Sequence, residues 1–438
     1  MGGQEPGGVS QGLDRRALLA AAIAGASLAA GPGLARTASR YAALEAMLDG
    51  WIRARRIPGA VVAIVRPGRF RPDYVMAGTT AFEGGRPVDR RTLWRIYSQT
   101  KPVTGVAVVQ QVAAGRLTLD TPIGDILPEF RQMQVLLDPA RGLESRPAAG
   151  PILVRHLLTH TAGFSYHIMG NDPIEQEYRR RGLLPIGNLG LGLSPLDGPV
   201  PDLDGFIRAL AALPLRFDPG TAYRYSLALD VAGGMLQRLL ATPFDQVLAR
   251  QLFAPLGMAD TGFVVAPGSA PRLAALYSWQ DEKGQRLDTP MLVDRADDSA
   301  WLRLPPLPAG GAGLVSSAED YAKFAQMLLN EGVFEGRTIL PRVAARQAMT
   351  NMLPPGLFFD KVKGYAAGGQ VILADSRTAP AGTLPGTFGW GGAAGTLFQV
   401  DPLRQFAVVL MLQGLALPLN QGQGLQAALN SEVAAGRL

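Results

Sequence analysis

Cysteine is absent from this chain of 438 residues, and histidine occurs only three times. The absence of cysteine excludes disulfides, zinc–thiolate sites and a thiol nucleophile. His156, His160 and His167 lie close together, but the segment His-Leu-Leu-Thr-His lacks the glutamate of an HExxH zinc helix. We therefore expect no metal site, and structural roles for the three histidines.

Charged residues are also scarce, at 18% of the chain against 47% hydrophobic residues. A chain of this length and composition can bury a large core, either as two domains or as one fold with a sizeable insertion. The net charge is +6, but the arginines are scattered, and their longest run is Arg179–Arg181. The sequence shows no basic face or aromatic–basic motif, so nucleic acid is not an expected partner.

The N-terminal segment resembles an export signal. Arg15 and Arg16 precede a run of small apolar residues, Ala17–Ala30, and Gly33–Ala35 offers the small residues that a signal peptidase needs. The paired arginines indicate the twin-arginine route, and a run this short cannot span a bilayer as a stable anchor. The alternative is a helix inside the fold, which the glycines on both sides of the run disfavour. We expect residues 1–35 to be a signal segment and the protein to be exported to the periplasm.

Apolar periodicity predicts a helix and strands near both ends of the chain, with helices between them. We expect an α/β fold in which an antiparallel sheet, flanked by helices, is built from both chain ends and carries an inserted all-α domain. The predicted sheet domain covers residues 36–97 and 301–438, and the mostly helical domain covers 98–300. Residues 168–204, rich in glycine, proline and leucine, are expected to form a loop or lid. The predicted elements are a helix over 41–55, strands over 60–65, 74–77, 395–400 and 406–412, and a helix from about Gly424.

Ser98 and Lys101 form the strongest chemical pattern in the sequence. The chain has five lysines, and only Lys101 has a serine three residues before it. Because proline is tolerated near the first turn of a helix, Pro102 predicts a helix that begins close to Ser98. Residues three apart on a helix share a face, so the Lys101 ammonium can reach the Ser98 hydroxyl. A serine needs such a neighbour to act as a nucleophile, and free N–H groups at a helix start can bind an oxyanion.

Several segments, in order, resemble the serine β-lactamase and penicillin-binding protein superfamily, in its class C-like branch. Ser98–Lys101, which reads Ser-Gln-Thr-Lys, resembles the nucleophile motif. Phe217–Gly220 followed by Tyr223–Ser226 resembles the second motif, and Val154–Phe164 and Gly310–Asp320 resemble further family segments. The resemblance runs over most of the chain and implies the β-lactamase/DD-peptidase fold, with no cofactor.

The resemblance also implies roles for single residues. Ser98 attacks the acyl carbonyl and is activated by Lys101 and Tyr225. The N–H groups of Ser98 and Ala393 form the oxyanion hole. The base is either Lys101 or Tyr225, because coupled groups share their titration. The Gly-x-Ser-x-Gly pattern occurs only at Gly8–Gly12, inside the predicted signal segment, so no nucleophile elbow is expected in the fold and the usual histidine triad is disfavoured.

The third family motif is Lys-Thr-Gly, and here the chain departs from it with Trp390, Gly391 and Gly392. This replacement resembles the family VIII carboxylesterases and implies that these three residues face the substrate. A lysine on this strand can pair with the carboxylate of a β-lactam, whereas a tryptophan cannot. The second motif continues into Leu227, where an asparagine would bond the amide side chain of a β-lactam. Each missing contact is worth about 1–3 kcal/mol, so both losses favour a plain ester.

The leading hypothesis is a serine carboxylesterase that cleaves short- to medium-chain esters through an acyl-enzyme on Ser98, with a small-molecule ester as its partner. One alternative is a β-lactamase or DD-peptidase that acts on β-lactams or peptidoglycan stems. Others are an acyltransferase of the same fold and a penicillin sensor that stays acylated. The sequence predicts no stable membrane span and leaves the oligomeric state open.

Overall fold

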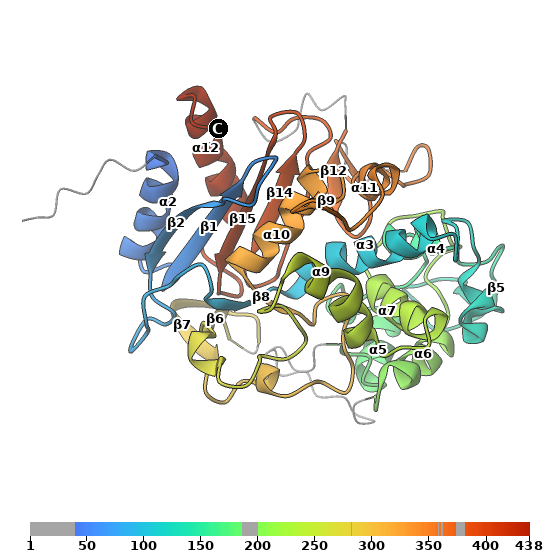
Figure 1. The fold of residues 1–438 in the computed structure, drawn as a ribbon. Helices are drawn as coiled ribbons and strands as arrows, with labels where there is room; N and C mark the ends of the chain where they lie inside the picture. The colour runs from blue at the N-terminus through green and yellow to red at the C-terminus, as the bar shows by residue number, and fades with distance from the viewer. Residues whose placement is uncertain (1–39, 186–199, 282, 358, 361, 374–381) are drawn as a thin grey trace, which may run out of the picture. The chain divides into compact units, whose positions relative to one another are not determined.

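A seven-stranded sheet takes its strands from both ends of the chain (Figure 1). The computed structural model describes residues 40–185, 200–281, 283–357, 359–360, 362–373 and 382–438. The strand order is β11-β12-β13-β14-β15-β1-β2, and each neighbouring pair is antiparallel. The predicted antiparallel sheet flanked by helices is therefore confirmed. The strands are β1 (Gly59–Val65), β2 (Asp73–Gly78), β11 (Lys363–Tyr365), β12 (Gln370–Ile372), β13 (Phe388–Gly391), β14 (Leu397–Asp401) and β15 (Phe406–Leu412).

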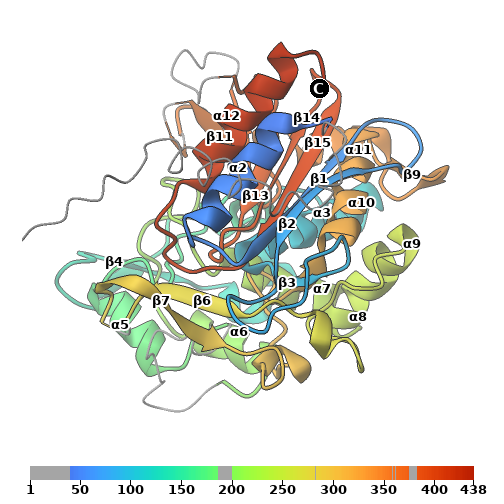
Figure 2. The same ribbon diagram turned by 90° about the vertical axis from the view of Figure 1, so that its left-hand side faces the viewer.

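Helices cover both faces of this sheet (Figures 1 and 2). On one face, Val62 of β1 packs in a core cluster with α2 (Ala42–Arg53) and α12 (Gln421–Ala434). On the other face, Val61 belongs to the main core, which includes α10 (Ala318–Leu329). Since neither face meets water, every residue of β1 and β15 is buried, and neither strand carries a polar side chain.

Most of the other helices lie in the chain between β3 (Leu93–Arg95) and β8 (Val315–Ser317), which pair with each other. Figure 1 shows α3 to α7 gathered beside the sheet. Two hairpins lie in the same stretch, β4 with β5 and β6 with β7, so an all-α insertion is not confirmed. The division into two domains stays a prediction, and contacts gather Tyr41–Leu438 into one compact unit. The bounds are α3 (Thr100–Ala113), α4 (Val154–Leu158), α5 (Pro173–Arg180), α6 (Leu203–Ala211), α7 (Ala228–Leu239), α8 (Phe244–Leu248), α9 (Ala254–Leu256), β4 (Gln134–Leu136), β5 (Ser145–Pro147), β6 (Leu276–Gln280) and β7 (Arg286–Asp294).

The segment 168–204, predicted to form a loop or lid, contains the short helix α5. Pro173 stands at its first position, and only Ile174 and Tyr178 give it an apolar stripe. A helix of eight residues with two apolar side chains carries too little periodicity to stand out from a Pro-rich stretch. Residues 186–199 of the expected lid lie outside the described part of the chain.

The predicted signal segment, residues 1–35, also lies outside the described residues. Within the ranges that the structure describes, no helix is both long and apolar enough to cross a membrane.

The remaining elements of the C-terminal part are the small hairpin β9 (Val333–Phe334) with β10 (Arg337–Thr338), and the helix α11 (Arg342–Ala348).

Arg95, at the end of β3, is a fully buried cation that ties several segments together. Its Nε donates to Asp294 Oδ2 at 2.7 Å and its Nη1 donates to the Ala274 carbonyl at 2.6 Å. Its Nη2 donates to Ser299 Oγ at 3.1 Å, and the guanidinium lies 5.4 Å from the centre of the Trp301 ring. Burial lowers the pKa of Arg95, and the Asp294 carboxylate opposes that shift. Arg95 thus anchors the β6–β7 hairpin to the strand that leads into Ser98.

We expect Arg95→Met to lower the free energy of unfolding by about 3–5 kcal/mol, because it leaves a mostly buried carboxylate without its cation. Urea denaturation of the purified protein measures this loss. The matched control is Arg295→Met, whose ion pair with Asp297 is exposed and should contribute little. Equal losses in the two variants would rule out a special role for the buried pair.

Candidate active site

Ser98 lies in a 3-10 turn, Tyr97–Gln99, between the end of β3 and the start of α3. Tyr97 has a φ of 43°, a left-handed conformation that costs a non-glycine residue energy. Its ring is buried and contacts the Trp301 ring at 5.8 Å, which holds this backbone in place. As Pro102 predicted, α3 begins close to Ser98, at Thr100. The N-terminal end of a helix favours negative charge there.

The structure brings the three predicted catalytic residues together. Tyr225 Oη lies 2.7 Å from Ser98 Oγ, and Lys101 Nζ lies 3.3 Å from the same oxygen. The Lys101 side chain is fully buried, whereas Ser98 and Tyr225 are partly exposed. The hydroxyl groups of Ser98 and Tyr225 are therefore accessible to a substrate, whereas the Lys101 ammonium is not.

Lys101 is held by groups from distant parts of the chain. Its Nζ donates to the Gly311 carbonyl at 2.6 Å. The ammonium also lies 4.6 Å from the centre of the Tyr225 ring and 5.5 Å from that of Tyr166, within the range of cation–π attraction. These contacts orient Nζ toward Ser98 and compensate the cation for the loss of water.

Asp230 on α7 is a buried carboxyl that sequence reasoning missed. Its Oδ1 accepts a hydrogen bond from the Gly311 N–H at 2.8 Å. The carbonyl of the same glycine binds Lys101. Burial raises the pKa of Asp230 to about 6, and the Lys101 charge opposes that shift. One signal could have found it, since Asp230 is the acidic residue of an otherwise largely apolar helix that follows Tyr225.

Trp390, which is predicted to face the substrate, lies among aromatic rings beside Tyr225. Its ring is 5.7 Å from the Tyr225 ring and 5.2 Å from the ring of Tyr365. Phe359 contacts the same tryptophan at 5.8 Å. The strand that carries lysine in the third family motif therefore presents an aromatic surface beside Tyr225.

Gly392 lies directly against the turn that precedes Ser98. A Cβ atom there would stand 2.2 Å from the Ile96 carbonyl oxygen, so only glycine fits. The Gly395 N–H donates to the Gly392 carbonyl at 2.9 Å and closes a tight turn that carries the exposed Ala393. This turn packs beside the Ser98 turn, but the pairing of the Ser98 and Ala393 N–H groups as an oxyanion hole stays a prediction.

The three histidines are buried inside the fold. His156 Nδ1 accepts the Leu153 N–H at 3.1 Å, and His160 Nδ1 accepts the Ser226 N–H at 3.2 Å. Burial lowers the pKa of His156 and of His167 to about 4. In the part of the chain that the structure describes, no group of three or more His, Cys, Asp or Glu side chains is arranged to hold a metal ion.

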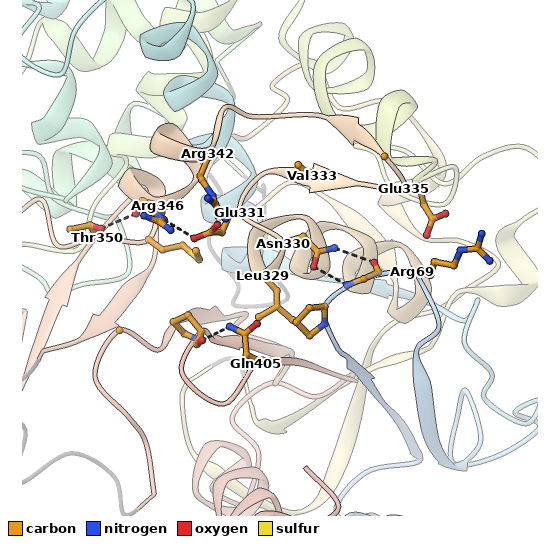
Figure 3. A pocket seen from close by; sticks show the side chains of 16 residues that line it. Arg69, Leu329, Asn330, Glu331, Val333, Glu335, Arg342, Arg346, Thr350 and Gln405 are labelled. Carbon is orange, nitrogen blue, oxygen red and sulfur yellow. Dashed lines mark hydrogen bonds and ion pairs between the residues drawn. The ribbon is translucent and has the colours of Figure 1, made fainter.

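A surface cavity of about 1120 Å³ lies elsewhere, beside the end of α10 and the start of α11 (Figure 3). Glu331 pairs there with Arg342 and, at 2.6 Å, with Arg346, so each of these three charged groups already has an ionic partner. The three predicted catalytic residues are not among those that line this cavity. The chemistry that the sequence predicts therefore belongs to the Ser98 site and not to this one.

Comparison with known proteins places the chain among relatives of similar length. Protein Rv1367c from Mycobacterium tuberculosis (strain ATCC 25618 / H37Rv) is 33% identical over 348 residues, which cover 77% of this chain and 81% of that protein. Esterase EstB from Burkholderia gladioli is 32% identical over 398 residues, which cover 87% of this chain and 93% of that protein. The solved structure of EstCE1, described as a hydrolase with promiscuous acyltransferase activity, is 27% identical, with a TM-score of 0.69, and the match covers 88% of this chain and 97% of that one.

The family model described as beta-lactamase matches residues 34–429. This match confirms the resemblance to the serine β-lactamase superfamily. The expected β-lactamase/DD-peptidase fold is confirmed by the same match and by the solved structure. This chain therefore belongs to the beta-lactamase family.

Proposed function

We propose that this protein is a serine esterase that cleaves short- to medium-chain carboxylic esters through an acyl-enzyme on Ser98. The observation that carries the proposal is the contact of Ser98 Oγ with both Tyr225 Oη, at 2.7 Å, and Lys101 Nζ, at 3.3 Å. A serine becomes a nucleophile when a neighbouring group can take its proton. The proposal is further supported by the similarity to a protein named an esterase.

The reaction runs in two halves on the same three residues. In the reactive state the Lys101–Tyr225 pair is one proton short, either as an ammonium with a phenolate or as a neutral amine with a phenol. Ser98 Oγ attacks the ester carbonyl, its proton passes to this pair, and the pair returns that proton to the departing alcohol. In the second half the pair takes a proton from water, the hydroxide attacks the acyl carbon, and the carboxylic acid leaves as Ser98 regains its proton. The N–H groups of Ser98 and Ala393 would stabilise the oxyanion in both halves.

The walls of the site favour a neutral substrate with an apolar acyl part. Trp390 offers an aromatic face where a lysine would pair with a carboxylate. Trp390 and Gly391 also line a cavity of about 510 Å³ whose walls include Phe359 and Leu397. This volume suits a short or medium acyl chain.

Export is a second part of the proposal. It rests on Arg15 and Arg16 before the apolar run Ala17–Ala30, a pattern that the twin-arginine system reads as an address. An ester-cleaving enzyme in the periplasm would meet substrates from outside the cell. Fractionation of the producing cells, with and without substitution of both arginines by lysine, tests this part.

We expect Ser98→Ala to lower kcat/KM for a p-nitrophenyl butyrate-type ester by at least about 10³-fold, because the nucleophile is lost. Mass spectrometry should detect an acyl adduct on the unsubstituted protein and none on the variant. Ser431→Ala, on the surface of α12, is the control and should keep full activity. Undiminished ester cleavage by Ser98→Ala would show that Ser98 is not the nucleophile. Turnover of a chromogenic cephalosporin faster than of the ester would favour a β-lactamase instead.

Lys101→Met and Tyr225→Phe should each lower kcat/KM by about 10²–10⁴-fold, the range of general acid–base contributions. Because both side chains serve one proton transfer, the double variant should be little slower than the slower single variant. Lys323→Met, which removes a cation paired with Asp320, is the control. Multiplied losses in the double variant would show instead that the two residues act independently.

A second candidate function is acyl transfer to an alcohol. It is favoured by the similarity to EstCE1 and by the partly exposed Ser98 and Tyr225, which an alcohol could reach as well as water. With a primary alcohol added to the ester assay, we expect a transfer ester that rises with alcohol concentration and is absent in Ser98→Ala. Formation of the free acid alone at every alcohol concentration would exclude the transferase.

A further inference from the structure

His160 is a histidine that neither a triad nor a metal site explains. It is fully buried and follows α4 in a left-handed conformation, with a φ of 56°. Only a residue that the surrounding structure strongly determines keeps such a conformation. The segment that His160 begins runs alongside the segment that carries Tyr225, since the Leu227 N–H donates to the Ser165 carbonyl at 3.1 Å.

His160 accepts hydrogen bonds from the residues on both sides of Tyr225 in the chain. The His160 carbonyl accepts the N–H of Arg224, the residue before Tyr225, at 3.0 Å. Its side-chain Nδ1 accepts the N–H of Ser226, the residue after Tyr225, at 3.2 Å, and lies 3.0 Å from Ser226 Oγ. The imidazole ring also contacts the Tyr225 ring, with centroids 4.7 Å apart. The backbone and the ring of Tyr225 are thus held by one residue.

This arrangement requires a neutral imidazole. Nδ1 can accept the Ser226 N–H only while it carries no proton, which puts the ring proton on Nε2. Burial, together with the charge of Lys101, lowers the pKa of His160 well below its ordinary value. The other rings around it are those of Tyr223 at 6.1 Å and Tyr365 at 5.2 Å. Burial raises the pKa of both phenols, so neither supplies an anion that would favour a protonated imidazole.

We infer that His160 is a positioning residue that fixes Tyr225 Oη within hydrogen-bond distance of Ser98 Oγ. The inference rests on the proposed function, in which Tyr225 shares the proton transfer with Lys101. It assigns a histidine to the reaction without making it a base. A displacement of Tyr225 of about 1 Å would be enough to slow proton transfer by about 10²-fold.

His156 provides a matched control in the same region of the chain. Its Nδ1 also accepts a backbone N–H, that of Leu153 at 3.1 Å, and its side chain is also buried. The N–H that it accepts lies at the start of α4 and not beside Tyr225. Replacing either histidine therefore removes a hydrogen bond from a backbone N–H to Nδ1, but only the loss at His160 should reach Tyr225.

The experiment compares His160→Leu, His160→Asn, His160→Gln and His156→Leu in kcat, KM and thermal midpoint. We expect His160→Leu to lower kcat by about 10²-fold with little change in KM. His160→Asn should recover most of the loss, because asparagine carries its amide oxygen on Cγ, as histidine carries Nδ1, and tolerates a left-handed backbone. Glutamine places its amide one carbon further out and should not recover kcat. His156→Leu should lower the thermal midpoint but leave kcat unchanged.

An unchanged kcat in His160→Leu would overturn the inference. So would an equal loss of kcat in His156→Leu, because the effect would then be general destabilisation. If His160→Leu does not fold, the asparagine and glutamine variants decide, and equal kcat in those two would overturn the role of the Nδ1 acceptor. Failure of the proposed function looks different, since Ser98→Ala would then keep its esterase activity.

Discussion

The buried Lys101 ammonium is the group around which the site is organised. A cation removed from water must find electron-rich partners within the protein. The Gly311 carbonyl, Ser98 Oγ and the faces of two tyrosine rings supply them. These partners come from the start of α3, the loop before β8 and the segments on either side of α5. Because one buried charge needs all these partners, the elements that carry them must meet at one point. Asp230 holds Gly311 in place by accepting its N–H.

Strand β13 of the sheet carries Trp390, which lies beside the Tyr225 ring. Strand β13 and the Ser98 turn lie side by side although they are far apart in sequence. The Thr396 hydroxyl donates to the Ile96 carbonyl at 3.4 Å, and Gly392 allows the close approach. Trp390 is carried on this strand to the Tyr225 ring. Its replacement of a cation removes the electrostatic reason for binding a carboxylate, while the machinery around the nucleophile stays intact.

Local patterns predicted much of this architecture. The helix predicted over 41–55 is α2, the strands over 60–65 and 406–412 are β1 and β15, and the helix expected after Ser98 is α3. The predictions that the structure does not confirm involve elements with weak local signals. Helix α5 has two apolar residues, and the β6–β7 hairpin is tied to the fold by the buried Arg95 rather than by an apolar stripe. Asp230 was missed because its partner is a peptide group far along the chain.

The sequence by itself determined which groups are available for chemistry. The absence of cysteine and the unique Ser-x-x-Lys spacing singled out Ser98 and Lys101, and the resemblance to a known family added Tyr225 as the third expected member of the site. The sequence also replaced the lysine of the third motif by Trp390. Only the tertiary structure decided how these groups are held. His160 accepts the N–H of Ser226, next to Tyr225, and Asp230 accepts the N–H of Gly311, whose carbonyl binds Lys101. The physical reason is that a hydrogen bond to a backbone N–H or carbonyl depends on position in space and leaves no mark on residue type.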